Sequence, residues 1–387
     1  MSSTRSRAIL KHSLVLALPT VVIVAAAVVT MLWRVPTRVT LDLTANRAVF
    51  TVGGAERVLL LSDVQFSTIT LEKFARISLR PERLQSVDLA TSIRPDGRIA
   101  ESDWRTLNII PPVVLQGLRK DLSPSVTFEA AAVGTAPGGK LTQLWIHPGT
   151  RVTLEVRGLR PDHPTVELDR NTSRDKLSPV ELSFTGLFHL TMHQARATGI
   201  PDALGSRSPM YRGELGGASP LVEVESENDA LLLSLAGVPA TGTETLVRGG
   251  IPVDALCFER QGPTGAPESS FTGVGAIGYP DFPALPRIVL GASDLLRLDG
   301  LSRFRIENVA AAADGLRFRA TGMARRIMTS SGGFAVDHRR TSFDAVWQNP
   351  RLAVLFGVSV WALTSTIAGY RLFRKVVGRN GGPRRRR

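Results

Sequence analysis

The sequence predicts a mainly β protein, in which a sandwich- or barrel-like extracytoplasmic β domain lies between two transmembrane α-helices. Two observations predict this fold class. An apolar segment without a charge lies near each end of the chain, at residues 13–33 and 352–370. Between these segments, short alternating or apolar runs recur and are separated by turn residues, which is the pattern of antiparallel sheets.

Residues 1–12 form a basic N-terminus, and residues 13–33 form the first predicted transmembrane helix. Ser13 to Trp33 is 21 residues without a charge. At a rise of about 1.5 Å per residue, such a helix matches a hydrocarbon core of about 30 Å. Cleavage as a secretory signal near Ala25–Ala27 is the alternative, because small residues there resemble a cleavage site. The apolar run continues to Trp33, an expected membrane-interface anchor, which favours an uncleaved helix.

Residues 34–258 are predicted to form an extracytoplasmic β domain. Residues typical of turns, such as Gly53-Gly54 and Pro95-Asp96-Gly97, separate its expected strands. Here and further along the chain we expect strands at Val39–Leu43, Arg47–Val52, Val58–Leu61, Ala75–Leu79, Ser125–Val133, Val152–Val156, Val180–Leu190, Leu221–Val224, Ala230–Leu235, Val253–Phe258, Phe304–Val309 and Leu316–Ala320.

Residues 259–287 are rich in proline and glycine, which predicts a linker or a long loop. We therefore divide the β region there and expect a small β unit at residues 288–346. A single continuous sandwich with a long surface loop is the alternative. Helices are a minority, and the two best short candidates are Val113–Asp121 and Ser293–Leu298.

The second predicted transmembrane helix covers residues 350–370, with Trp347 and Tyr370 as expected membrane-interface anchors. Along it, four small residues and Trp361 recur at a spacing of four, and such a stripe of small residues lets helix backbones approach closely in lipid. We therefore expect this stripe to pack against the first span or against another subunit in a homo-oligomer. Its residues are Ala353, Gly357, Ser365 and Gly369.

The distribution of charge predicts that both termini are cytoplasmic. The formal net charge is +13, but 11 basic residues lie in residues 1–33 and 352–387, which contain no acidic residue. Cytoplasmic flanks of membrane spans carry such an excess, so the basic tail at residues 371–387 is expected to contact membrane lipid. Residues 34–351 are nearly neutral, which argues against nucleic acid as a partner.

Two glycine-rich segments resemble nucleotide-binding motifs in letters only. Gly273–Gly278 matches a dinucleotide-binding pattern, but the prolines that follow it prevent the helix that must hold the phosphates. Gly134–Lys140 has the spacing of a phosphate-binding loop, but Leu141 replaces the serine or threonine that contacts Mg²⁺. We therefore expect no cofactor.

The remaining candidate residues favour structural roles, and we expect no metal site and no catalytic residues. His189 and His193 share a face of a strand or a helix, but no third ligand is evident nearby. Glu223, Glu225 and Glu227 alternate and are expected on the solvated face of a strand. The single cysteine, Cys257, is expected to be a buried strand residue.

These observations predict a plasma (inner) membrane protein whose β ectodomain is a non-enzymatic interaction, scaffold or accessory module. Its expected partner is another envelope or membrane protein. An oligomeric channel or transport subunit is one alternative, although residues 13–33 and 352–370 contain none of the charged residues that ion pathways usually need. A membrane-tethered envelope hydrolase is the other, because the carboxylates Asp96, Glu101 and Asp103 lie close together in sequence.

Overall fold

A computed structural model gives the fold of most of the β region. It describes residues 36–80, 87–90, 101–107, 113–118, 123–130, 138–156, 160, 162–170, 178–198, 210–215, 221–226, 230–239, 245–283, 285–331 and 334–338, together with Val354, Trp361, Ser365, Gly369 and Arg371. Arg38–Pro280 and Pro286–His338 form one compact unit, which we call the β body. Met1–Thr37, Asp281–Leu285 and Arg339–Arg387 form a second unit.

The described residues are mainly β, as the sequence predicts. Strands account for 73% of them and pair in antiparallel sheets, consistent with a β sandwich. Within the described part of the β body, η1 (Glu101–Asp103) is a single 3-10 turn. Within this part of the chain, no helix is both long enough and apolar enough to cross a membrane. The predicted span at 13–33 lies outside the described residues, as does most of the span at 350–370.

One layer of the β body, called sheet I, consists of two runs of paired strands. The first run ends with β18, and β3 of the second run lies beside β18. In order, the first run is β22 (Ile288–Leu290), β21 (Gly275–Gly278), β1 (Thr37–Ala45), β25 (Gly315–Ala324), β24 (Ser302–Ala312) and β18 (Thr245–Cys257). The second is β3 (Val58–Phe66), β10 (Gly139–Ile146), β13 (Val180–His193), β16 (Leu221–Ser226), β5 (Phe74–Arg80), β8 (Val113–Gly117) and β14 (Ala195–Thr198).

The other layer, sheet II, is one continuous antiparallel run that also contains β18 and β13. In order, it is β27 (Phe334–Asp337), β26 (Arg326–Ser331), β23 (Leu295–Asp299), β18, β2 (Arg47–Val52), β11 (Thr150–Val156), β12 (Pro164–Arg170), β17 (Ala230–Ala236), β4 (Thr68–Glu72), β9 (Ser125–Ala130), β13, β15 (Met210–Leu215), β6 (Val87–Ala90) and β7 (Trp104–Leu107). A separate hairpin contains β19 (Glu259–Gln261) and β20 (Pro267–Ser269).

The long strands β13 and β18 pass from one sheet to the other. The first part of β13 pairs with β10 and β16 of sheet I, and its second part pairs with β9 and β15 of sheet II. The transfer occurs at Gly186, whose φ is +142°. A Cβ at this position would lie 2.8 Å from the carbonyl oxygen of Gly138. Glycine is therefore required here, both by the backbone conformation and by the close approach of the neighbouring chain.

The core lies between the two sheets. Along β1, Val39, Leu41 and Leu43 are buried, and the residues between them are more exposed, which is the period-2 pattern of a strand with one buried face. Phe66 and Phe184 from sheet I contact Phe128 and Phe188 from sheet II, with ring centroids 4.9–6.5 Å apart. All four side chains are at most 2% exposed. This cluster, which we call the phenylalanine cluster, joins the two layers.

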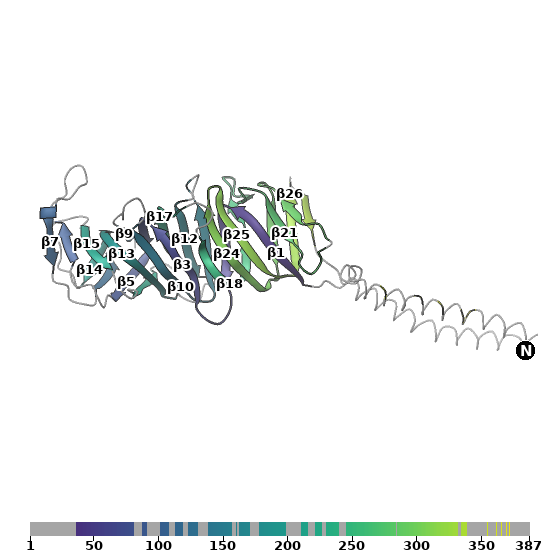
Figure 1. Ribbon diagram of the computed structural model, residues 1–387, viewed down its shortest axis with the longest axis horizontal. Helices are drawn as coiled ribbons and strands as arrows, with labels where there is room; N and C mark the ends of the chain where they lie inside the picture. The colour runs from purple at the N-terminus through teal and green to yellow at the C-terminus, as the bar shows by residue number, and fades with distance from the viewer. Residues whose placement is uncertain are drawn as a thin grey trace, which may run out of the picture. The chain divides into compact units, whose positions relative to one another are not determined.

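The first strand of the β body, β1, and its last strands, β26 and β27, lie at the same end of the body. Figure 1 shows β1 and β26 at one end of the β body and β7 at the opposite end. The pairings agree, since β1 is near the end of sheet I and β27 is the edge strand of sheet II beside β26. The strands cross the long direction of the β body between these ends.

The two predicted short helices are wrong. In place of a helix at Val113–Asp121, Val113–Gly117 forms strand β8, which pairs with β5 on one side and β14 on the other. In place of a helix at Ser293–Leu298, Leu295–Asp299 forms strand β23. In both cases partner strands are available on neighbouring segments, and pairing with them overrides a weak local preference.

The Pro/Gly-rich segment 259–287 contains three short strands, β19, β20 and β21. Strands that precede it and strands that follow it pair with each other, because β18 pairs with both β23 and β24. The described residues on both sides of the segment therefore share the same sheets. The predicted domain boundaries themselves, 34–258, 259–287 and 288–346, stay a prediction.

Candidate functional site

Of the residues predicted to pack in the membrane, the structure describes Ser365 and Gly369. Both have a helical backbone and are exposed. A Cβ added to Gly369 would meet no atom within 4 Å. The packing role of the stripe stays a prediction. The other predicted membrane residues lie outside the described residues: Trp33, Trp347, Ala353, Gly357 and Tyr370.

The segments that resemble nucleotide-binding motifs lie partly in strands. Gly275–Gly278 is β21, which pairs with β1 on one side and β22 on the other. Gly139–Ile146 is β10, between β3 and β13. The described residues of these segments present no helix N-terminus to a phosphate, which both motifs require.

The polar residues considered as ligands or catalysts are spread over several elements. His189 and His193 are on β13, Glu223 is on β16, and Glu101 is in η1. Among the residues that the structure describes, no group of three or more His, Cys, Asp or Glu side chains is arranged to hold a metal ion.

The clearest candidate site is an open groove of about 500 Å³ beside the β19–β20 hairpin. We call it the arginine groove. Arg47 and Val49 alternate along β2 with the buried Ala48 and Phe50, so their side chains point away from the core. The groove is lined by Arg47, Val49, Arg151, Cys257, Glu259, Arg260, Gln261, Gly265 and Pro267.

Buried contacts fix the hairpin over the sheet. Its two ends are Phe258 and Phe271, whose rings lie 5.5 Å apart and are at most 5% exposed. Ser270, between β20 and Phe271, is 1% exposed. Its Oγ lies 2.6 Å from the carbonyl oxygen of Arg47 and 2.8 Å from that of Phe258, and these two acceptors share its single hydroxyl hydrogen. The backbone carbonyl of Arg47 is therefore hydrogen-bonded to Ser270, the residue that follows the hairpin.

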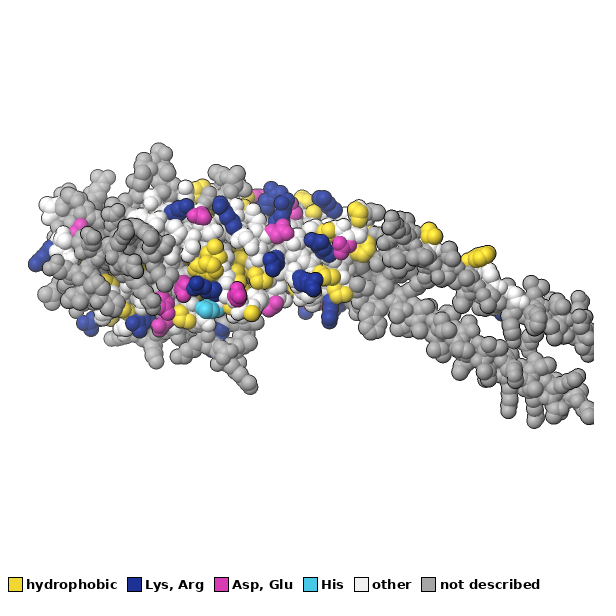
Figure 2. Space-filling model, turned by 60° about the horizontal axis from the view of Figure 1, so that its bottom comes forward, with side chains coloured by type: hydrophobic (Ala, Val, Ile, Leu, Met, Phe, Trp, Pro, Cys, Tyr) yellow, Lys and Arg dark blue, Asp and Glu magenta, His cyan; other side chains and the backbone are white. Residues whose placement is uncertain are grey.

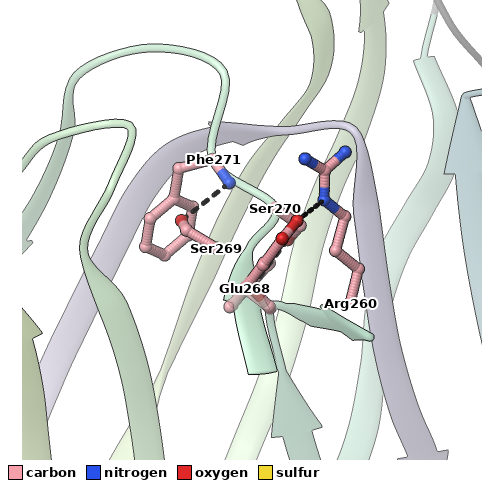
Figure 3. Close-up of polar contacts among 6 residues, drawn as sticks. Arg260, Glu268, Ser269, Ser270 and Phe271 are labelled. Atoms are coloured by element: carbon pink, nitrogen blue, oxygen red, sulfur yellow. Dashed lines mark hydrogen bonds and ion pairs between the residues drawn. The ribbon is translucent and has the colours of Figure 1, made fainter. Parts of the chain in front are cut away.

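One of the three arginines in the groove is already paired. Arg260 Nε lies 3.1 Å from a carboxylate oxygen of Glu268, and Figure 3 shows the two side chains facing each other across the hairpin. On the same hairpin, Ser269 Oγ accepts a hydrogen bond from the Phe271 amide, at 3.2 Å. These contacts stiffen the wall of the groove and neutralise the charge of Arg260.

The other two arginines, Arg47 and Arg151, form no ion pair within the described part of the chain. The Nε atom of Arg47 is buried and has no hydrogen-bond partner. Glu155 lies opposite Arg47 in the register of β2 and β11, yet the structure gives no ion pair between them. A buried donor without an acceptor destabilises the folded state.

Cys257 lies on the floor of the groove, opposite Val49 in register. It is a strand residue, as the sequence predicts, but it is half-buried rather than buried. Burial raises the pKa of its thiol, the negative charge of Glu259 raises that pKa further, and Arg151 opposes both effects. A thiol with a raised pKa is a poor nucleophile near neutral pH, so the thiol is not an activated catalytic group.

The arginine groove can thus bind negative charge, but it contains no acid–base pair with an activated nucleophile. Sequence reasoning missed it because Arg47, Arg151 and Arg260 come from strands that are far apart in the chain. Figure 2 shows basic and acidic side chains interspersed over one face of the molecule, so single arginines in the sequence do not stand out. Comparison with models of protein families gives no match, and no curated protein matches the sequence at a significant level.

Proposed function

We propose that this chain is a membrane protein with two transmembrane helices, at residues 13–33 and 350–370, anchored in the plasma membrane. In this proposal its β body lies outside the cytoplasm and serves as a non-enzymatic interaction or scaffold module for another envelope component. The uncharged segments and the basic, acid-free termini support the anchoring.

One structural observation carries the proposal furthest: both chain ends leave the β body at the same end. A body held by two anchors in one membrane needs this arrangement. β1 starts at Thr37, four residues after Trp33, so its start can lie at most about 14 Å from the membrane interface. Asp337, at the end of β27, precedes Asn349 by 12 residues, a reach of about 40 Å.

The dimensions of the β body suit a spacer or scaffold. Thirteen strands follow one another in sheet I, and strands lie about 4.8 Å apart, so the sheet extends on the order of 60 Å. The phenylalanine cluster and the strands shared by the two sheets make the layers mechanically continuous. A body of this kind can hold a docking surface away from the membrane.

Photo-crosslinking in living cells tests the interaction role. A photoreactive amino acid replaces Leu118, which is 59% exposed just after β8, and in a second variant replaces Leu115 in the same strand, which is 0% exposed. We expect light-dependent adducts with a distinct envelope protein from position 118 and none from position 115. If position 118 and other exposed positions of the β body give only unreacted protein, the interaction role is wrong.

A further inference from the structure

The arginine groove combines a cavity with uncompensated positive charge. Four charged side chains line it: Arg47, Arg151, Arg260 and Glu259. Glu268 neutralises Arg260, which leaves two arginines against one glutamate. The side chains that line the groove therefore have a positive excess, although residues 34–351 as a whole are nearly neutral.

The orientation of the arginines favours a ligand over a purely structural role. Arg47 and Arg151 come from neighbouring strands, β2 and β11, at positions that point away from the core. Within the described residues neither arginine forms an ion pair. A guanidinium group presents several N–H donors in one plane and matches the oxygens of a carboxylate or a phosphate.

We infer that the arginine groove binds an oxyanion, a phosphate or carboxylate group, held by Arg47 and Arg151. Ser270 positions Arg47 through its hydrogen bond to the Arg47 backbone. This inference is independent of the proposed membrane anchoring, since every residue of the groove lies in the described β body.

The chain contains its own reporter for this site. Cys257 is its single cysteine and lies in the groove, so the full-length protein in a non-ionic detergent can be labelled at one position. The rates of labelling by an anionic and by a cationic methanethiosulfonate reagent are compared. Both reagents need the thiolate, so the ratio of their rates cancels the pKa of the thiol and reports the local potential.

We expect the anionic reagent to be favoured at Cys257 relative to a free cysteine peptide. Arg47→Gln and Arg151→Gln should each lower the anionic-to-cationic rate ratio about threefold or more, by removal of one charge at a short distance. The matched control is Arg248→Gln, which removes an exposed arginine on β18 that does not line the groove. Equal ratios for the wild type and both groove variants would overturn the inference.

Occupancy is tested by protection of Cys257 from uncharged iodoacetamide. The probes are inorganic phosphate, citrate and micelles doped with phosphatidylglycerol, and each variant is checked for folding by circular dichroism. Protection by phosphate or citrate identifies a free oxyanion, and protection by phosphatidylglycerol alone identifies a lipid headgroup. Glu268→Gln releases Arg260 and should strengthen protection about threefold. The absence of protection by all three probes, in the wild type and in Glu268→Gln, contradicts the inference.

Discussion

Replacement of Phe184 in the phenylalanine cluster measures how strongly the two sheets depend on each other. Phe184 is fully buried, and its ring centroid lies 4.9 Å from Phe128, 5.2 Å from Phe188 and 6.5 Å from Phe66. Removal of a buried Phe ring typically costs about 3–5 kcal/mol. Because three aromatic contacts disappear together, we expect Phe184→Ala to lower the free energy of unfolding by about 4 kcal/mol.

Two further variants separate the volume of the ring from its position in the core. Phe184→Leu keeps most of the apolar volume but loses the edge-to-face geometry, so we expect a cost of about 1.5 kcal/mol. Phe334 on the edge strand β27 is 80% exposed, and Phe334→Ala should cost less than about 0.5 kcal/mol. We therefore predict that Phe184→Ala lowers the free energy of unfolding most, Phe184→Leu less, and Phe334→Ala least.

The assay is equilibrium unfolding of the full-length chain in urea, followed by circular dichroism in the far ultraviolet. The midpoint and the slope are compared with those of the wild type, and an unchanged slope indicates that only stability has changed. The reasoning is refuted if Phe184→Ala costs no more than Phe334→Ala. In that case the cluster would not join the two layers.

Three further predictions concern single positions. Gly186→Ala should cost about 2–3 kcal/mol in urea unfolding, because the residue has a φ of +142° and a Cβ there lies 2.8 Å from a backbone oxygen; a wild-type midpoint contradicts this. Ser270→Ala should lower the free energy of unfolding by about 1–2 kcal/mol, because the carbonyl oxygens of Arg47 and Phe258 lose the Ser270 hydroxyl as a donor. The same change should speed alkylation of Cys257, and unchanged stability and labelling would refute this. Glu259→Gln should lower the pKa of the Cys257 thiol, seen as a shift of the alkylation profile to lower pH, and a shift to higher pH reverses the argument.

The strands were predictable because burial of one face leaves a period of two in the sequence. Val39, Leu41 and Leu43 show it clearly, and β1 is found there. The same logic failed at Val113–Gly117, where prolines upstream suggested the start of a helix although Val113 and Val114 are β-branched and suit a strand. Local sequence does not reveal that β5 and β14 are available as partners.

The arginine groove could not be predicted, because its charge balance arises only on folding. Arg260 is neutralised by Glu268, eight residues later, a pairing that depends on the register of the hairpin. The Nε atom of Arg47 is left without an acceptor, and the hydrogen bond from Ser270 fixes the Arg47 backbone beside the hairpin. A sequence shows the residues, but register and burial decide which of them keep an exposed charge.

The most direct test of the account determines on which side of the membrane the β body lies. An epitope is inserted at Gly149, in the turn between β10 and β11 where a side chain would meet no atom within 4 Å, and a second variant carries the epitope after Arg387. Antibody binding is measured on right-side-out and inside-out membrane vesicles. We predict binding to the Gly149 epitope in right-side-out vesicles and to the C-terminal epitope in inside-out vesicles. Binding to both epitopes on the same side, or recovery of the protein outside the membrane fraction, contradicts the account.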